Sequence, residues 1–160
     1  MTNARDISLG VAIILWATIL GGVAYSHIVF FPPYLSALPQ SASLVHGPYG
    51  LHDERFWLMI HPLLILSLIV TFALHWRVKP RRNRIAISMG IYAVAIVATA
   101  IYFVPELIAF AKSPESNVTA AEWYARGQTW QHLSWLRGVF MYAGFIPLLL
   151  AFRRPAAVSA

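Results

Sequence analysis

Four long apolar runs, separated by polar segments, account for most of the chain. They cover residues 7–31, 56–76, 85–106 and 130–152. A membrane-spanning helix needs about 20 mainly apolar residues at a rise of about 1.5 Å per residue, and each run reaches that length. The runs also lack the polar–apolar alternation that marks the strands of a membrane barrel. The pattern therefore predicts an all-α bundle of four transmembrane helices, in a single membrane domain over residues 1–160.

The first run differs from a cleaved signal peptide. Its apolar stretch exceeds the core of about 7–15 residues that signal peptides carry. Pro32 and Pro33 follow it where a cleavage site would lie. We therefore expect the first run to be retained as a transmembrane helix.

Basic residues are concentrated on one side of the predicted membrane domain. They lie in the short segment between the second and third runs and next to both ends of the chain: Arg77, Lys79, Arg81, Arg82 and Arg84, with Arg5, Arg153 and Arg154. Segments rich in Lys and Arg stay in the cytoplasm. Four spans bring both termini to the same side, so the charge pattern predicts cytoplasmic termini and two outward-facing loops.

The two predicted outer loops are long and are not plainly polar. The first, from Pro32 to Arg55, is rich in Leu and Tyr, so we expect it to fold over the outer mouth of the bundle as a lid. The second runs from Leu107 to Thr129. There, Thr119 and Glu122 have the spacing of a helix capping box, which predicts a short interfacial helix over residues 120–126, with Trp123 as an anchor.

Composition supports a membrane protein and excludes several kinds of site. The chain is 59% hydrophobic and 11% charged, whereas soluble domains carry about a quarter charged residues. It has no cysteine, so disulfides, iron–sulfur clusters and thiolate-bound metals are excluded. The net charge of +6 follows from the topology signal, and no soluble segment interleaves basic and aromatic residues as nucleic-acid binders do.

Each apolar run carries a polar residue near the end that the charge pattern places outside. These residues are His27, His61, Glu106 and His132. A polar group at membrane depth is costly unless it has a partner or a function. Four such groups on four helices predict one shared site in the outer leaflet.

Helical phase gives some of these groups a direction. Along the third run, polar residues recur at spacings close to whole turns and so share one face: Ser88, Tyr92, Thr99 and Glu106. In lipid such a face turns toward protein, so Glu106 is expected to point inward. Arg137 lies five positions after His132, about 140° around the helix, so the two cannot both face the bundle axis. We expect Arg137 to pair with Glu106 or to reach a ligand.

Two cofactor-based chemistries fit these residue types. His27, His61, His132 and Glu106 could ligate iron, copper or manganese, since bundles build such centres from inward side chains. Alternatively, two of the three histidines could be the axial ligands of heme b, with Arg55 or Arg137 beside the propionates.

A cofactor-free pocket is the third chemistry. There a histidine would act as general base on a quinone-like or aromatic molecule, while Arg137 stabilises the resulting oxyanion. Purely structural roles also remain open: His27 or His61 could bond a free backbone carbonyl, and His75 is expected at the inner interface.

Short motifs resemble a known group of membrane proteins. Tyr102-Phe-Val-Pro-Glu106 closes the third run and Trp130-x-x-x-x-Trp135-Leu-Arg137 opens the fourth, with Gly22, Pro32 and Pro33 at the end of the first. Together they resemble small four-helix proteins related to anthrone oxygenases. The resemblance implies an oxygenase-like reaction on a phenolic or anthrone-type substrate, without a required metal. This chain has Glu106 where that family has an asparagine after Val-Pro.

The glycine-rich first run also resembles membrane heme proteins of copper-resistance and porphyrin-oxidation families.

These observations lead to one functional expectation with two alternatives. We expect an integral membrane oxidoreductase, in a bacterial inner membrane, that binds a transition metal or heme b and acts on a hydrophobic, quinone- or phenol-like molecule. Glu106 and Arg137 are its expected catalytic residues. The alternatives are a cofactor-free oxygenase and a non-catalytic ligand-binding or assembly protein, either of which could form a homo-oligomer.

Overall fold

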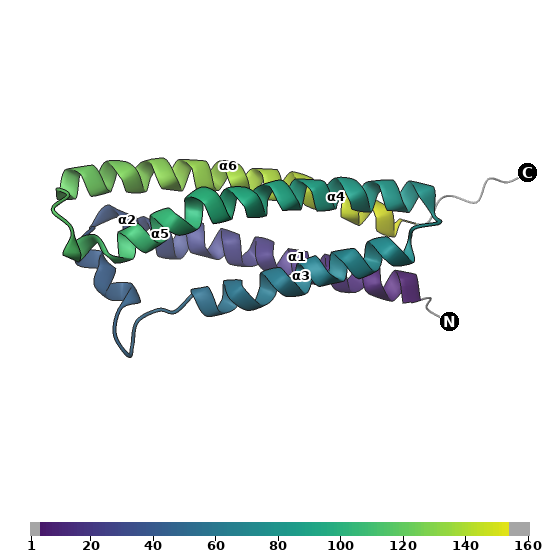
Figure 1. Cartoon of the computed structure of the whole chain (residues 1–160), viewed down its shortest axis with the longest axis horizontal. Coiled ribbons are helices and arrows are strands. Elements are labelled where there is room, and N and C mark those ends of the chain that lie inside the picture. Colours follow the sequence, from purple (N-terminus) through teal and green to yellow (C-terminus); the bar gives the residue numbers. More distant parts are fainter. Residues whose placement is uncertain (1–3, 154–160) are drawn as a thin grey trace, which may run out of the picture.

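The computed structural model describes residues 4–153, and Arg154 lies outside them. Within this range the chain forms four long helical rods without a strand (Figure 1). The first and third rods each consist of two α-helices joined by a π-helical segment, whereas the second and fourth are single α-helices. The elements are α1 Ala4–Tyr25, π segment Ser26–Phe30, α2 Phe31–Ser36, 3₁₀ segment Gln40–Val45, α3 Glu54–Leu74, α4 Lys79–Ala98, π segment Thr99–Phe103, α5 Val104–Ala111, 3₁₀ segment Ser113–Glu115 and α6 Ala120–Phe152.

All four predicted transmembrane runs are helices long and apolar enough to cross a membrane. They correspond to the rods Ala4–Ser36, Glu54–Leu74, Lys79–Ala111 and Ala120–Phe152. Three of these rods have 33 residues and are therefore about 50 Å long, whereas the hydrocarbon core of a bilayer is about 30 Å thick. Each long rod therefore extends beyond the hydrocarbon.

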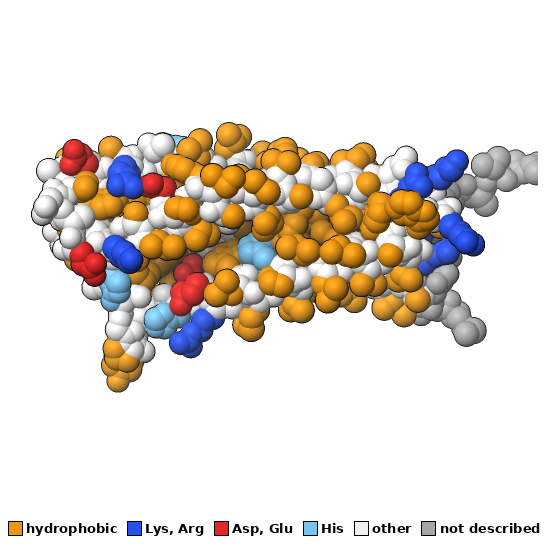
Figure 2. Space-filling model, viewed as in Figure 1, with side chains coloured by type: hydrophobic (Ala, Val, Ile, Leu, Met, Phe, Trp, Pro, Cys, Tyr) orange, Lys and Arg blue, Asp and Glu red, His pale blue; other side chains and the backbone are white. Residues whose placement is uncertain are grey.

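The rods pack unevenly around the bundle. Helix α3 packs mainly on α1, α4 packs mainly on α6, and α1 also packs on α6. The backbones of α4 and α6 approach closely at Gly144, where an added Cβ would lie 2.5 Å from Ile91 Cγ2. Between α3 and α4 the surface is hollowed, and a histidine side chain lies in the hollow (Figure 2). The interior of the bundle can therefore be reached from the side.

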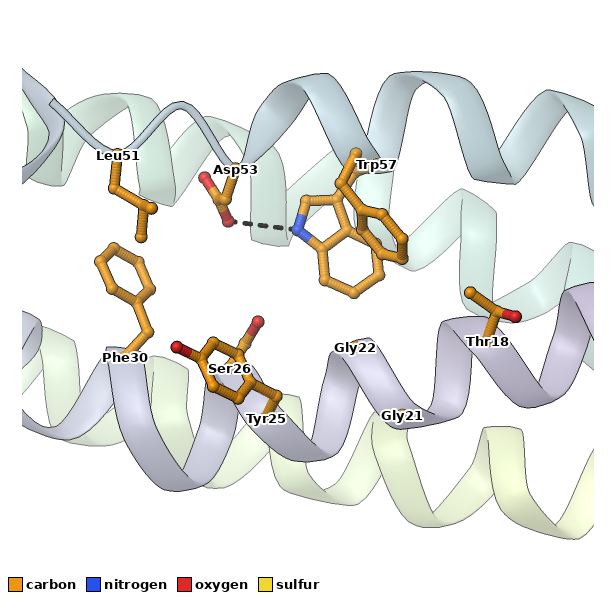
Figure 3. Close-up of a pocket in the computed structure, with 10 residues that line it drawn as sticks. Thr18, Gly21, Gly22, Tyr25, Ser26, Phe30, Leu51, Asp53 and Trp57 are labelled. Atoms are coloured by element: carbon orange, nitrogen blue, oxygen red, sulfur yellow. Dashed lines mark hydrogen bonds between the residues drawn. The ribbon is translucent and has the colours of Figure 1, made fainter. Parts of the chain in front are cut away.

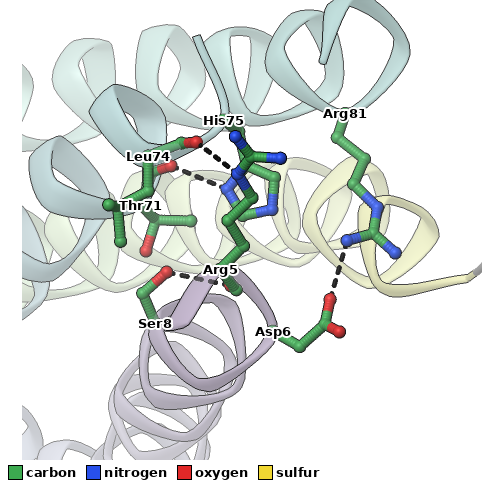
Figure 4. A network of polar contacts seen from close by, with 7 residues as sticks. All are labelled: Arg5, Asp6, Ser8, Thr71, Leu74, His75 and Arg81. Carbon is green, nitrogen blue, oxygen red and sulfur yellow. Dashed lines mark hydrogen bonds and ion pairs between the residues drawn. The ribbon is translucent and has the colours of Figure 1, made fainter. Parts of the chain in front are cut away.

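Charge divides the two ends of the bundle. Figure 2 shows that basic side chains gather at the end that carries both described termini, which we call the basic end. There Arg81 Nη1 lies 2.7 Å from Asp6 Oδ1 (Figure 4). Arg84 Nη1 also donates to the Leu150 carbonyl at 2.6 Å. The opposite end, the mixed end, carries both acidic and basic side chains. This segregation agrees with the charge pattern of the sequence.

The first long loop covers less of the bundle than the sequence predicts. Leu38 and Ala42 are buried against the mixed end, so the first half of the loop is packed. The second half projects from the bundle (Figure 1), and Tyr49 at its tip is fully exposed. The tip owes its exposure to Gly47, whose φ of 77° reverses the chain away from the helices.

The prediction of a separate interfacial helix over residues 120–126 is wrong. The Thr119–Glu122 capping box is present, but the helix that it starts continues without a break to Phe152. No glycine or proline interrupts the chain between the capping box and the fourth run except Gly127, which packs against Leu35. Trp123 consequently lies in the core at 3% exposure rather than anchoring the interface.

Candidate functional site

The four polar residues that the sequence predicts to converge do not form one cluster. His27 is buried at 2% exposure and His61 is partly buried. His132, in contrast, is exposed on the face of α6 that points away from the other rods. Glu106 binds Arg126, with 2.9 Å between Oε1 and Nη2. Among residues 4–153, no group of three or more His, Asp or Glu side chains is placed to hold a metal ion.

Helical phase explains why His132 lies outside. The buried positions of α6 recur every three or four residues and include Trp130, Ser134 and Gly138. His132 is two residues from both Trp130 and Ser134, so it points to the opposite side of the helix. Arg137 and Ser134 instead face the other rods, as the 140° separation predicts for Arg137.

Arg137 lies at the centre of a hydrogen-bonded network between three rods. Its Nη1 donates to Thr99 Oγ1 at 2.7 Å, and its Nη2 donates to Ser134 Oγ at 3.0 Å. Ser134 Oγ also lies 2.9 Å from His27 Nε2. Thr99 in turn donates to the Ala95 carbonyl at 2.7 Å. We call Arg137, Thr99, Ser134 and His27 the Arg137 network.

The network fixes the protonation of His27. Its Nδ1 lies 2.7 Å from the Val23 carbonyl, which can only accept, so Nδ1 carries the proton. The neutral Nε2 is then an acceptor, and the Ser134 hydroxyl donates to it while accepting from Arg137. His27 is thereby satisfied at both nitrogens and holds Ser134 in place.

The charge of Arg137 is not neutralised inside the bundle. Its two described hydrogen-bond partners are neutral hydroxyls, and its Cζ lies 4.1 Å from the centroid of the Phe103 ring. Its Nε is buried without a partner, and no carboxylate in residues 4–153 forms an ion pair with it. A cation without a counter-charge in a membrane-spanning helix costs at least about 2.5 kcal/mol, so Arg137 is a candidate functional residue.

The two π-helical segments lie at the level of this network. Ser26–Phe30 contains His27, and Thr99–Phe103 contains both Thr99 and the ring that Arg137 covers. A π segment inserts an extra residue into the helix, which changes the direction of the side chains that follow. Such segments occur frequently at functional sites.

His61 and Tyr92 form a second polar pair. His61 Nδ1 lies 2.6 Å from the Tyr92 hydroxyl, and the imidazole stacks on Trp57 with ring centroids 5.6 Å apart. Tyr92 is buried and packs on Trp16. His61 Nε2 has no hydrogen-bond partner in the described part of the chain, and the side chain is partly exposed. Arg137 lies close enough for its charge to act on both His61 and His27.

The donor set does not fit a metal centre or a bis-histidine heme. Both nitrogens of His27 are engaged, and its ring lies against Trp130 and Trp135. Of the predicted ligands, only His61 keeps an available nitrogen within the bundle. Because His132 is outside and Glu106 is paired with Arg126, no second ligand faces His61.

Three other sequence predictions receive a clear outcome. The Glu106–Arg137 pair is not formed, because Arg137 lies eleven residues, or about 16 Å, beyond Arg126 along α6. Arg55 is exposed at the start of α3, and no hydrogen bond or ion pair within residues 4–153 links its side chain to the Arg137 network. His75 lies at the basic end, as expected, but it is fully buried rather than interfacial.

Ser134 is the site residue that sequence reasoning missed. Its signal was its position three residues before Arg137, which places both on one helical face.

The chain was also compared with models of protein families, with characterised proteins and with solved structures, and none of them matches it.

Proposed function

We propose that this protein is a membrane enzyme that binds a hydrophobic phenol- or quinone-like molecule at Arg137 and acts on it by proton transfer. One observation carries the proposal: Arg137 is a cation within a membrane-spanning helix whose described partners are neutral. An anionic oxygen would supply the missing counter-charge. In a low-dielectric environment such charge pairing is far stronger than in water.

The ligand's character follows from the surroundings of Arg137. Phe103, Trp130 and Trp16 supply aromatic walls near the two polar groups. An aromatic ring system with a hydroxyl or carbonyl oxygen matches these walls and reaches the site from the lipid. The hollow between α3 and α4 supports lateral entry (Figure 2).

His61 is the best placed proton acceptor. Its Nδ1 is held by Tyr92, so the Nε2 that remains is oriented by a fixed hydrogen bond. A phenol or an acidic ring C–H would lose its proton to His61 Nε2, and Arg137 would stabilise the phenolate or enolate that forms. Arg137 and Ser134 then bind the oxyanion, and His27 is a positioning residue.

An oxidation follows naturally from this deprotonation. An electron-rich phenolate or anthrone enolate can reduce dioxygen, which is the oxidant that we propose. For an anthrone, one ring CH₂ and one O₂ give one C=O and one H₂O, so atoms and electrons balance. His61 and the Arg137 network together supply the acid–base part of this reaction with residues of the chain alone.

We further infer that the basic end faces the cytoplasm of a bacterial cell. The concentration of Lys and Arg at that end supports this orientation. Arg137 lies 15 residues, or about 22 Å, from the end of α6 at Phe152. With a hydrocarbon core of about 30 Å starting at the basic end, the network lies in the outer leaflet.

The proposal is tested by comparing 1-naphthol with its methyl ether, 1-methoxynaphthalene, as ligands of the purified protein in maltoside micelles. The wild-type protein should prefer 1-naphthol, and Arg137→Gln should weaken its binding about 10- to 100-fold, the range of a charge-assisted hydrogen bond. Arg126→Gln, which removes a cation of the mixed end, is the matched control. Equal binding of both compounds, or no effect of Arg137→Gln, would overturn the proposal.

A non-catalytic binding protein is distinguished by turnover. If 1-naphthol binds through Arg137 but His61→Gln leaves the consumption of dioxygen with an anthrone substrate unchanged, the site binds without catalysing this reaction. Loss of turnover with binding retained supports the enzyme.

A further inference from the structure

A pocket outside the Arg137 network lies between residues 18–30 of the first rod and the start of α3. Its volume is 430 Å³, within the range of small-molecule sites. Figure 3 shows Asp53 and Trp57 on one side and Phe30, Ser26 and Tyr25 on the opposite side, on the first rod. The pocket is also lined by Thr18, Gly21 and Gly22 of α1 and by Phe56 of α3.

Two neighbouring glycines create this pocket for different reasons. At Gly22 an added Cβ would lie 2.8 Å from Phe56 Cε1, so glycine allows the two aromatic rings of α3 to approach α1. At Gly21 an added Cβ would meet nothing within 4 Å, so this position borders open space. Thr18 and Tyr25 are exposed, and the pocket therefore opens sideways, toward lipid.

Among residues 4–153, Asp53 is the only charged residue that lines the pocket. Its Oδ2 accepts a hydrogen bond from Trp57 Nε1 at 3.1 Å (Figure 3). Within the described range, 4–153, no basic side chain forms an ion pair with it. Burial raises the pKa of the Asp53 carboxyl, and the neighbouring Glu54 charge raises it further.

We propose that this pocket binds an organic ammonium group carried on an apolar body, with the ammonium between Asp53 and the surrounding aromatic rings. The negative charge of a carboxylate compensates for the hydration that the cation loses on binding. The faces of Trp, Tyr and Phe rings attract the cation further through cation–π interactions. A metal ion would need more oxygen ligands than one carboxylate provides. A wholly apolar ligand would leave the Asp53 carboxylate without a counter-charge.

The position of the pocket suggests where such a ligand comes from. Asp53 immediately precedes the apolar rod Glu54–Leu74, so the charged side of the pocket lies at the end of a span and close to the boundary of the hydrocarbon core. Phospholipid headgroups lie at this depth, and a free lipophilic amine also partitions there. The pocket is separate from the Arg137 network, because none of its lining residues belongs to that network.

Benzyltrimethylammonium is a suitable probe, in uncharged maltoside micelles that contain no competing ammonium. Its neutral isostere, in which carbon replaces nitrogen, is (2,2-dimethylpropyl)benzene. Isothermal titration should show that the cation binds at least about tenfold more tightly than the isostere. Asp53→Asn retains an acceptor for Trp57 but should abolish this preference. Binding should also weaken at acidic pH, as Asp53 becomes protonated.

Gly21→Leu tests the location without removing a charge. Its side chain would fill the pocket and should block the probe, whereas Gly10→Leu is the matched control because Gly10 also meets nothing within 4 Å but lies outside the pocket. Equal binding of cation and isostere, or full binding by Asp53→Asn or Gly21→Leu, would overturn the proposal. Neither result would affect the 1-naphthol test.

Competition separates the two sources of the ammonium. Short-chain phosphatidylcholine that displaces the probe, while phosphatidylglycerol with the same chains does not, identifies a lipid-headgroup site. Displacement by a lipophilic amine but by neither phospholipid identifies a site for free amines. Displacement by both phospholipids alike would contradict ammonium recognition.

Discussion

The hydroxyl of Ser134 joins Arg137 to His27, so its removal tests how the site is held together. Ser134→Ala deletes one acceptor for Arg137 Nη2 and the donor to His27 Nε2, at 3.0 and 2.9 Å. Ser134 is completely buried, so neither group gains water in exchange. His27 Nε2 is then left with a buried, unused lone pair.

The size of the effect follows from two hydrogen bonds and one orphaned nitrogen. Hydrogen bonds between membrane helices contribute about 0.6 kcal/mol on average and at most about 1.7 kcal/mol. A buried acceptor without a partner costs about 1–3 kcal/mol. Since Arg137 keeps its bond to Thr99, we expect Ser134→Ala to lower the free energy of unfolding by about 1–3 kcal/mol.

Ser88→Ala is the matched control. Ser88 is also completely buried, but its hydroxyl has no hydrogen-bond partner in the described part of the chain. Its removal should change the free energy of unfolding by less than about 0.5 kcal/mol, or stabilise the protein. Unfolding of both variants in mixed micelles, titrated with dodecyl sulfate and followed by circular dichroism, gives the two values. A loss for Ser134→Ala no larger than that for Ser88→Ala would refute the network.

The remaining predictions concern packing and charge elsewhere. Gly144→Ala should destabilise the protein by about 1–3 kcal/mol, since its Cβ would overlap Ile91, whereas Gly90→Ala, with nothing within 4 Å, should stabilise it by up to about 1 kcal/mol. Arg126→Gln should cost less than about 1 kcal/mol, because its ion pair with Glu106 is partly solvated. Burial raises the pKa of Asp53 above its unfolded value, so the wild-type protein should lose stability relative to Asp53→Asn as the pH rises through the folded-state pKa.

Each of these has a direct check by the same unfolding titration. Equal stability of the Gly144→Ala and Gly90→Ala variants would contradict the close approach of α4 and α6. A loss of several kcal/mol in Arg126→Gln would mean that the Glu106 pair is effectively dry. If the stability difference between wild-type and Asp53→Asn proteins does not change with pH, burial does not perturb this carboxyl.

The positions of the four rods could be predicted from hydropathy, because a bilayer admits few alternatives to apolar helices. The inward face of the third run was equally readable: Ser88 and Tyr92, spaced by four residues, are both buried. The lengths of the rods, in contrast, could not be predicted from hydropathy. Only Gly127 separates residues 120–126 from the fourth run, and one glycine does not end the helix, which therefore continues through both segments.

The candidate site was harder to predict because depth is only one of its coordinates. His27, His61, Glu106 and His132 lie near the same end of their runs, but the rotation of each helix decides which residues meet. The π segments add to the difficulty, because they shift the phase of His27 and Thr99 in a way that ideal helices do not show. The ion-pair partner of Glu106 also depends on where α6 begins. Because α6 extends far enough to include Arg126, Glu106 pairs with Arg126 and not with Arg137.

The central claim is that Arg137 binds an anionic oxygen of a ligand. The absorption spectrum of bound 1-naphthol tests this claim most directly. At a pH where free 1-naphthol is protonated, the wild-type protein should convert bound 1-naphthol to its phenolate, seen as the red-shifted naphtholate band. Arg137→Gln should remove this band, while Arg126→Gln should retain it. A wild-type protein that binds only the protonated form, or a naphtholate band that survives in Arg137→Gln, would contradict the account.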